Sequence, residues 1–140
     1  MLGLGGISGR SMHVLTDGTY GKVFQVTEEP LESFTARVKA RFETERVVVY
    51  GARPVRKVAS FCGAGMDEST VAFALAEGAD TFVSSDAKHH HIAALVEHDV
   101  NVVLLTHYAA ENYGFVRFAE NLKNKLKGLS VTVFTDERLL

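Results

Sequence analysis

Apolar runs alternate with segments of helical period from Val55 to the end of this 140-residue chain. The runs VASF, DTFVSS, NVVLL and SVTVF are mostly apolar or β-branched, and each of the first three is followed by a short turn and an amphipathic segment. Strands that are buried on both faces and joined by helices are typical of β-α-β units with a parallel sheet. We therefore predict an α/β fold of three layers, in which a mostly parallel sheet is flanked by helices.

The part of the chain before Val55 is less regular. Residues 1–19 are rich in glycine and small polar residues and have no sustained period, so we expect an irregular segment there and one α/β domain over residues 20–140. A strand is predicted over Tyr20–Val26. The acidic, proline-marked stretch Thr27–Pro30 then predicts the start of a helix. The runs RVVVY and VRKVASF predict two further strands with a turn between them.

Composition and charge exclude several classes of protein. The formal net charge is -2, and the lysines and arginines are scattered along the chain, so neither nucleic acid nor an anionic membrane is an expected partner. No apolar run approaches the roughly 20 residues that cross a bilayer. A single cysteine, Cys62, cannot form an internal disulfide, and the start lacks the pattern of a signal peptide. We expect a cytoplasmic protein.

The first predicted strand end that carries unusual residues is the turn FCGAGMDES, which contains Gly63 and Gly65. Ligands of open α/β sheets gather beyond the carboxyl ends of the strands, and a glycine-rich turn there can hold a phosphate or a cofactor on exposed amides. The alternative is a tight turn that needs glycine, with Asp67 or Ser69 capping the next helix. The tight turn is favoured, because the turn has neither a complete G-x-G-x-x-G pattern nor a Walker lysine.

The second strand end is SSDAKHHH, which contains three adjacent histidines, His89 to His91. If a helix begins at Asp86, the side chains of Asp86 and His90 share one face and can converge on a cation or on each other. We then expect His90 to face the site, and His89 or His91 to be more exposed. Alternatively, Asp86 caps the helix and the histidines are solvated residues of its first turn.

The third strand end is LLTHYAAEN, in which His107 and Glu111 are four positions apart. An imidazole and a carboxylate one helical turn apart can bind one divalent ion, provided that the helix includes both. Zinc prefers about four donors, so the other ligands would come from elsewhere in the chain, from another subunit or from water. The alternative is that Thr106 caps the helix and Glu111 is an ordinary carboxylate of its first turn.

Together these motifs resemble the carboxyl-terminal half of the GTP cyclohydrolase I type 2 homologues, or Nif-three-like dinuclear-metal-centre proteins. The family pattern has C-G-x-G, then G-A-D, then T-G-[DE]-x-K-Y-H-[DH], then G-H-Y-x-x-E. This chain has matching elements in the same order, from Cys62 to Glu111, and the resemblance extends from about Gly18 to the end. It departs from the pattern at Ser85, His89 and Thr106.

The resemblance implies that His107 and Glu111 are metal ligands and that Asp86 and His90 are nearby site residues. It also implies a homo-oligomer, the toroidal hexamer of the family, and a divalent cofactor such as zinc, manganese or iron. In the family an amino-terminal half supplies further ligands, two adjacent histidines and an aspartate. Because no counterpart of that half precedes Gly18, we expect this chain to carry half of a dinuclear site.

The leading hypothesis is a metal-binding protein, with metal-assisted hydrolysis as the reaction class if the protein is an enzyme. Its ligand would be a small molecule or a nucleotide. One alternative is a non-metal α/β module that binds a phosphate or a nucleotide at the glycine-rich turn. Another is a structural oligomer subunit without an intact active site.

Overall fold

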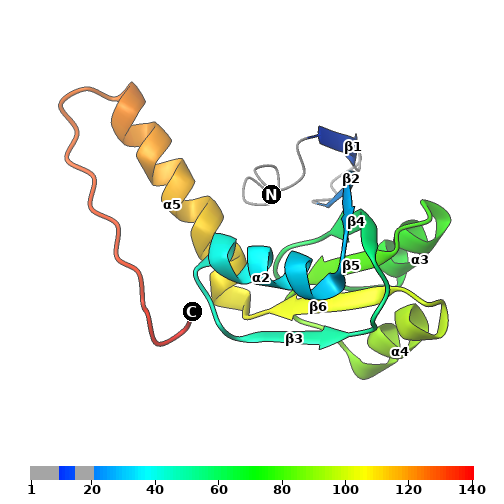
Figure 1. The fold of residues 1–140 in the computed structure, drawn as a ribbon. Coiled ribbons are helices and arrows are strands. Elements are labelled where there is room, and N and C mark those ends of the chain that lie inside the picture. Colours follow the sequence, from blue (N-terminus) through cyan, green and yellow to red (C-terminus); the bar gives the residue numbers. More distant parts are fainter. Residues whose placement is uncertain (1–9, 15–20) are drawn as a thin grey trace.

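The computed structural model describes residues 10–14 and 21–140. One sheet and its helices make up the fold (Figure 1). In chain order the elements are β1 (Arg10–Val14), β2 (Lys22–Glu29), α2 (Leu31–Phe42), β3 (Val47–Tyr50), β4 (Val55–Ser60), α3 (Glu68–Ala76), β5 (Thr81–Ser84), α4 (His89–Glu97), β6 (Asn101–Leu105) and α5 (His107–Lys125).

The six described strands form one sheet in the order β1-β2-β4-β5-β6-β3. Strands β4, β5 and β6 are parallel, whereas β1, β2 and β3 join by antiparallel pairing. The α/β class and the parallel succession of β4, β5 and β6 are confirmed. The whole sheet is mixed, because the strands before Val55 add to both edges of the parallel part by antiparallel pairing. The two predicted strands β3 and β4 are therefore not neighbours in the sheet.

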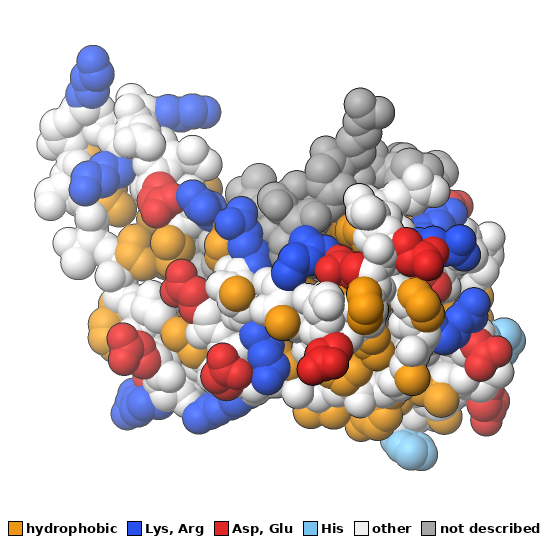
Figure 2. Space-filling view, viewed as in Figure 1, with side chains coloured by type: hydrophobic (Ala, Val, Ile, Leu, Met, Phe, Trp, Pro, Cys, Tyr) orange, Lys and Arg blue, Asp and Glu red, His pale blue; other side chains and the backbone are white. Residues whose placement is uncertain are grey.

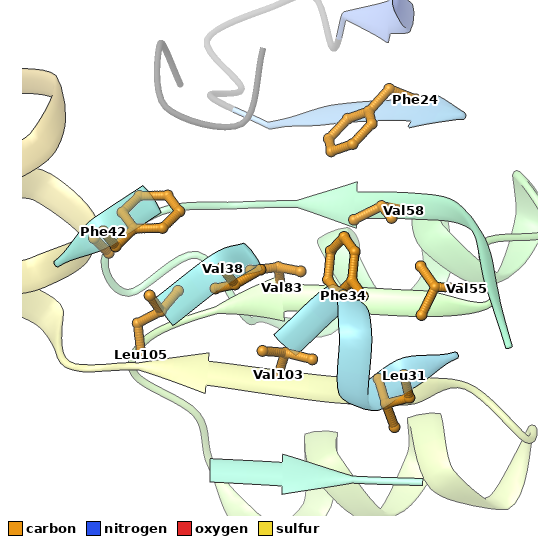
Figure 3. Packing of buried hydrophobic residues seen from close by; sticks show 11 residues of the cluster. Phe24, Leu31, Phe34, Val38, Phe42, Val55, Val58, Val83, Val103 and Leu105 are labelled. Carbon is orange, nitrogen blue, oxygen red and sulfur yellow. The ribbon is translucent and has the colours of Figure 1, made fainter. Parts of the chain in front are cut away.

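Helices cover both faces of the sheet. On one face, α2 packs Leu31, Phe34 and Val38 against side chains of the central strands (Figure 3). On the other face, α3 and α4 contribute Val71, Ala74 and Leu95 to a second cluster around Phe82 of β5. These three layers match the predicted architecture. They leave the carboxyl ends of β4, β5 and β6 at one end of the sheet, where the turns leading to α3, α4 and α5 begin.

Two boundaries in the first part of the chain differ from the predictions. The predicted helix start at Thr27–Pro30 is wrong over Thr27–Glu29, because β2 runs on to Glu29, which pairs with Val55 of β4. The helix begins at Leu31, after Pro30. The second difference is β1, which occupies Arg10–Val14 within the segment expected to be irregular, and the other residues of that segment lie outside the described part of the chain.

The predicted last strand, SVTVF over residues 130–134, is wrong. Residues 126–140 contain no strand. They follow α5, which leaves the body of the domain, and the chain then returns along it (Figure 1). Thr106 Oγ1 donates a hydrogen bond to Leu139 O, and Asp136 N–H donates one to Tyr108 Oη. These two contacts join the end of the chain to the start of α5.

Membrane insertion was not expected from the sequence. Among the described residues, no helix combines the length and the apolar character that crossing a membrane requires.

Candidate functional site

Helix α5 begins where the parallel strand β6 ends, and its first turn carries the imidazole and carboxylate pair. Thr106 is the N-cap, and its hydroxyl accepts a hydrogen bond from Ala109 N–H. The helix therefore begins at His107 and includes Glu111 one turn later. One helix thus contains both residues, as binding of one ion by the pair requires. The capping role of Thr106 is confirmed as well, so the cap and the ligand pair coexist in one turn.

The imidazole of His107 lies between two carboxylates. Its Nδ1 is 2.7 Å from Asp86 Oδ2, and its Nε2 is 3.1 Å from Glu111 Oε1. An ionised carboxylate can only accept, so His107 Nδ1–H is the donor to Asp86. All three side chains are about half exposed, with relative areas of 47% for His107, 55% for Asp86 and 59% for Glu111. An ion in solvent can therefore reach them.

The two carboxylates change the protonation of the imidazole. The hydrogen bond to Asp86 is the largest cause that raises the pKa of His107 above its ordinary value, and the negative charge of Glu111 adds to this. Partial desolvation acts in the opposite direction. The net effect is a His107 that holds its second proton more firmly than a free imidazole does.

The glycine-rich turn after β4 meets the same group. Gly63 has a φ of 63°, and a Cβ built there would lie 2.8 Å from Glu111 Oε1. Its carbonyl accepts a hydrogen bond of 3.2 Å from Asp86 N–H. The turns that carry Gly63, Asp86 and His107 are therefore adjacent in space, because the carboxyl ends of successive parallel strands meet at one end of a sheet.

The rest of the glycine-rich turn serves the start of α3. Asp67 is the N-cap of that helix, and its carboxylate and the hydroxyl of Thr70 form a capping box. A Cβ at Gly65 would lie 2.6 Å from the Cβ of Phe61, so Gly65 is required by packing within the turn. The structure thus gives Gly63 and Gly65 structural roles, and cofactor binding by them stays a prediction.

The prediction that Asp86 and His90 share a helix face is wrong. Helix α4 begins at His89, with Lys88 as the N-cap residue, so Asp86 lies outside the helix. Asp86 does not cap the helix either, because Lys88 occupies the N-cap position. The carboxylate of Asp86 instead accepts a hydrogen bond from Nδ1–H of His107.

The three adjacent histidines differ in solvent exposure. His89 and His90 are exposed, whereas His91 is 5% exposed and faces the sheet beside Leu95. His89 is exposed, as one of the two expected possibilities states, but the alternative in which all three histidines are solvated is wrong. Among the described residues, neither ring nitrogen of His91 finds a hydrogen-bond partner. The spacing from His91 to the buried Leu95, one helical turn, is the sequence signal for its burial.

The arrangement offers a partial set of metal ligands. Asp86 and Glu111 bond to opposite nitrogens of the His107 ring, so the three side chains do not converge on one point. Within residues 10–14 and 21–140, no group of three or more His, Cys, Asp or Glu residues is arranged to hold a metal ion. Nε2 of His107 and the carboxylate of Glu111 remain as two adjacent donors.

Comparison with known proteins gives curated relatives of one kind. A protein of Methanocaldococcus jannaschii named GTP cyclohydrolase 1 type 2 homolog is 36% identical over 70 residues, which are 50% of this chain and 28% of that protein. A protein of the same name from Staphylococcus aureus strain COL is 29% identical over 111 residues, 78% of this chain and 27% of its own length. The chain thus spans about a quarter of the length of these relatives.

Solved structures of similar fold support the same relationship. Reduced HcgD from Methanocaldococcus jannaschii has a TM-score of 0.73 and 26% identity, and the match covers 89% of this chain and 50% of that one. The Staphylococcus aureus protein SA1388 has a TM-score of 0.67 and 26% identity, with 84% and 40% covered. The model of the family described as Duf34/NIF3 (NGG1p interacting factor 3) matches residues 2–138. The chain belongs to the Duf34/NIF3 family.

Proposed function

We propose that this chain contributes His107 and Glu111 to a divalent metal site at the carboxyl end of β6. The observation that carries the proposal is the position of His107 between Glu111, one helical turn along α5, and Asp86, from the turn after β5. A histidine that binds a metal through one nitrogen commonly donates its other N–H to a carboxylate, which sets the orientation of the ring. The donor set therefore fits half of a metal site.

Each residue has a distinct role in this proposal. Nδ1–H of His107 donates a hydrogen bond to Asp86, so Nε2 is the nitrogen available to an ion. Glu111 presents its carboxylate on the same side as Nε2. Gly63 leaves the space that Glu111 Oε1 occupies, since a Cβ there would lie 2.8 Å from that oxygen. When bound, a zinc, manganese or iron ion would supply Lewis acidity for hydrolysis.

The substrate class that we propose is a nucleotide. The curated relatives are named as GTP cyclohydrolase homologues, which favours a nucleotide-like substrate and a hydrolytic reaction. Two donors from this chain leave most of the coordination sphere to water or to another chain. A further chain of a homo-oligomer, such as the hexamer implied by the resemblance, would complete the ligand set.

Binding of a phosphate at the glycine-rich turn is less well supported. The carboxylate of Asp67 accepts from Thr70 N–H at the start of α3. The carboxylate of Glu111 lies against Gly63. An anion placed at this turn would therefore meet negative charge instead of free amides.

Metal content tests the proposal. The purified chain is treated with chelator, loaded with zinc, manganese or ferrous iron in turn, desalted and analysed for metal by elemental analysis. The wild-type protein should retain metal weakly, and His107→Ala and Glu111→Ala should both lose most of it. Circular dichroism of each variant shows whether the domain is still folded.

A matched control uses a histidine away from this pair. His89 is exposed at the start of α4, so His89→Ala removes one imidazole without touching His107 or Glu111. Its metal content should equal that of the wild type. Equal metal content in wild type, His107→Ala and Glu111→Ala would eliminate the site, and it would favour a structural subunit without metal.

His90 needs a test of its own. We predicted it as a site residue, but within the described part of the chain no hydrogen bond or ion pair joins it to His107 or Glu111. Its ring instead contacts His91, with 4.2 Å between the ring centroids. A catalytic role requires His90→Ala to leave the metal content unchanged and to reduce turnover of a hydrolysable nucleotide. Unchanged turnover would remove His90 from the site.

A further inference from the structure

A cavity of about 830 Å³ lies between α2 and the connection from β3 to β4. Its volume falls within the range of about 300–1,000 Å³ that is typical of small-molecule pockets. Glu29, which lines it, pairs with Val55 at the start of β4, and Val49 lines it near the end of β3. His107 follows the carboxyl end of β6. The cavity therefore lies at the amino end of the parallel strands, away from the candidate metal site.

One wall of the cavity is a single face of α2. Glu32, Thr35 and Lys39 line it at intervals of three and four residues, which places them on one side of the helix. The ammonium of Lys39 donates a hydrogen bond of 3.2 Å to Glu45. Among the described residues, the buried hydroxyl of Thr35 has no hydrogen-bond partner. Threonine in a helix divides between two χ1 positions, so this hydroxyl can turn to a ligand that bonds it.

The opposite wall is apolar and is held in place from behind. Val49, Ala52 and Pro54 contribute to it. The buried side chain of Asn101 fixes the connection that carries this wall. Its Oδ1 accepts a hydrogen bond of 3.0 Å from Arg53 N–H, and its Nδ2 donates one of 2.9 Å to Arg53 O. A wall that is already ordered lowers the entropic cost of binding.

The lining of the cavity carries an excess of negative charge. Three glutamates and one lysine line it. Nε of Arg37 donates to Glu29, and Nε of Arg56 lies 3.5 Å from Glu28 Oε2. Within residues 10–14 and 21–140, no ion pair or hydrogen bond joins the carboxylate of Glu32 to another group. Figure 2 shows acidic side chains beside hydrophobic ones where Figure 1 places the start of α2 and the end of β3.

We propose that this cavity binds a small organic cation, a primary amine carried on an apolar ring. The ring lies against Val49, Ala52 and Pro54, and the ammonium group meets the carboxylate of Glu32 and the hydroxyl of Thr35. An ammonium has three donors and no acceptor, and both of these groups accept hydrogen bonds. A carboxylate or phosphate in the same place would be repelled by the glutamates of the lining, so charge selects the ligand.

Three probes with one indole ring test the proposal: tryptamine is positive, tryptophol is neutral and indole-3-acetate is negative. The chain has no tryptophan, so indole fluorescence excited at the red edge of its band reports the probe alone. Each probe is titrated with the full chain in the presence of chelator, so that the result does not depend on the metal site. Tryptamine should bind about tenfold more tightly than indole-3-acetate, with tryptophol between them. Tryptamine that does not bind, or binds no more tightly than indole-3-acetate, overturns the proposal.

Glu32→Gln tests the role of the charge. It should lower the affinity for tryptamine to that for tryptophol, and it should leave the affinity for tryptophol unchanged. Glu68→Gln is the matched control, because Glu68 is an exposed carboxylate in the first turn of α3. This control should bind tryptamine as the wild type does. Wild-type affinity for tryptamine in Glu32→Gln, or an equal loss in both variants, would show that Glu32 does not bind the cation.

Ala52→Phe tests the cavity itself. Ala52 is exposed in the connection between β3 and β4, so a larger side chain there fills the cavity without entering the core. The affinities for tryptamine and tryptophol should both fall about tenfold, because the phenyl group occupies the space of the indole ring. Circular dichroism of each variant shows that the domain is folded. Unchanged affinities in folded Ala52→Phe would place the probes elsewhere and overturn the proposal.

Discussion

The carboxylate of Asp86 lies 2.7 Å from Nδ1 of His107, a residue 21 positions later in the sequence. The contact links the turn after β5 to the start of α5. It fixes the ring, because the carboxylate can only accept and Nδ1 must then carry the proton. Nε2 then faces Glu111, and the chemistry proposed for the candidate site depends on this orientation of the ring.

Replacing Asp86 should change the titration of His107. In metal-free protein we expect the pKa of His107 to lie above its ordinary value of 6.5. Asp86→Asn removes the largest cause of the increase and should lower that pKa. The measurement is an NMR pH titration of the His107 ring protons. An identical titration in wild type and variant would contradict the contact.

The same contact predicts how the stability of metal-free protein changes with pH. A folded pKa above the unfolded value means that the folded state binds the proton more tightly. The contribution of His107 to the free energy of unfolding is therefore fully present below about pH 6.5, and it is lost as the pH rises through the raised pKa of the folded state. Urea unfolding should show this loss in wild type and a smaller loss in Asp86→Asn. The effect is small, because both side chains are about half exposed.

Gly63→Ala should disturb both stability and the site. The left-handed backbone costs a residue with a Cβ about 1–2 kcal/mol, and the added carbon would lie 2.8 Å from Glu111 Oε1. We expect a loss of about that size in the free energy of unfolding, together with weaker metal retention. Urea unfolding and elemental analysis measure the two effects.

Gly114→Ala is the matched control for that substitution. Gly114 lies within α5, and in the part of the chain that the structure describes a Cβ there would meet no atom within 4 Å outside its chain neighbours and its own helix backbone. Alanine is the better helix former, so this variant should gain about 0.5–1 kcal/mol. Metal retention should not change. Equal stability changes in the two glycine variants would contradict the distinction between them.

Asp67→Ala should destabilise α3 by about 1 kcal/mol, because it removes the N-cap and breaks the capping box. The hydrogen bond from Thr70 N–H is the largest cause that lowers the pKa of Asp67 below its ordinary 3.8. The charged carboxylate therefore stabilises the fold above that value, and its contribution is lost as the pH falls through the lowered folded pKa.

Asp67→Asn separates the cap from the charge. Asparagine caps helices about as well as aspartate, so stability near neutral pH should be close to wild type. The loss of stability on acidification should be smaller in this variant than in the wild type. Thermal unfolding over the acidic range measures it, and an acid profile equal to that of wild type would show that Asp67 does not contribute.

His91→Leu should be neutral or should stabilise the protein. The side chain is 5% exposed, and neither ring nitrogen has a hydrogen-bond partner within residues 10–14 and 21–140. An unpaired buried polar group costs about 1–3 kcal/mol, and an apolar side chain of similar size removes that cost. Urea unfolding gives the change. A loss above about 1 kcal/mol would mean that the ring is bonded in solution.

Local patterns predicted the elements that depend on local physics. The strand over Asn101–Leu105 was identified with its correct bounds, because a continuous apolar run must be buried on both faces of a sheet. The His107 and Glu111 pair was also found from spacing, since residues four apart share one face of any helix that includes both. Thr106 marked the start of that helix through its capping chemistry.

Contacts between distant segments decided the rest. Asp86 does not lie on α4, because the helix begins at His89. Its hydrogen-bond partner, His107, is 21 positions away in the sequence. The apolar residues 130–134 do not form a strand, since α5 carries the chain away from the sheet and none of the described strands pairs with them. Periodicity records which side chains can be buried, but a strand or an ion pair also needs a partner. Only the tertiary structure brings that partner within hydrogen-bond distance.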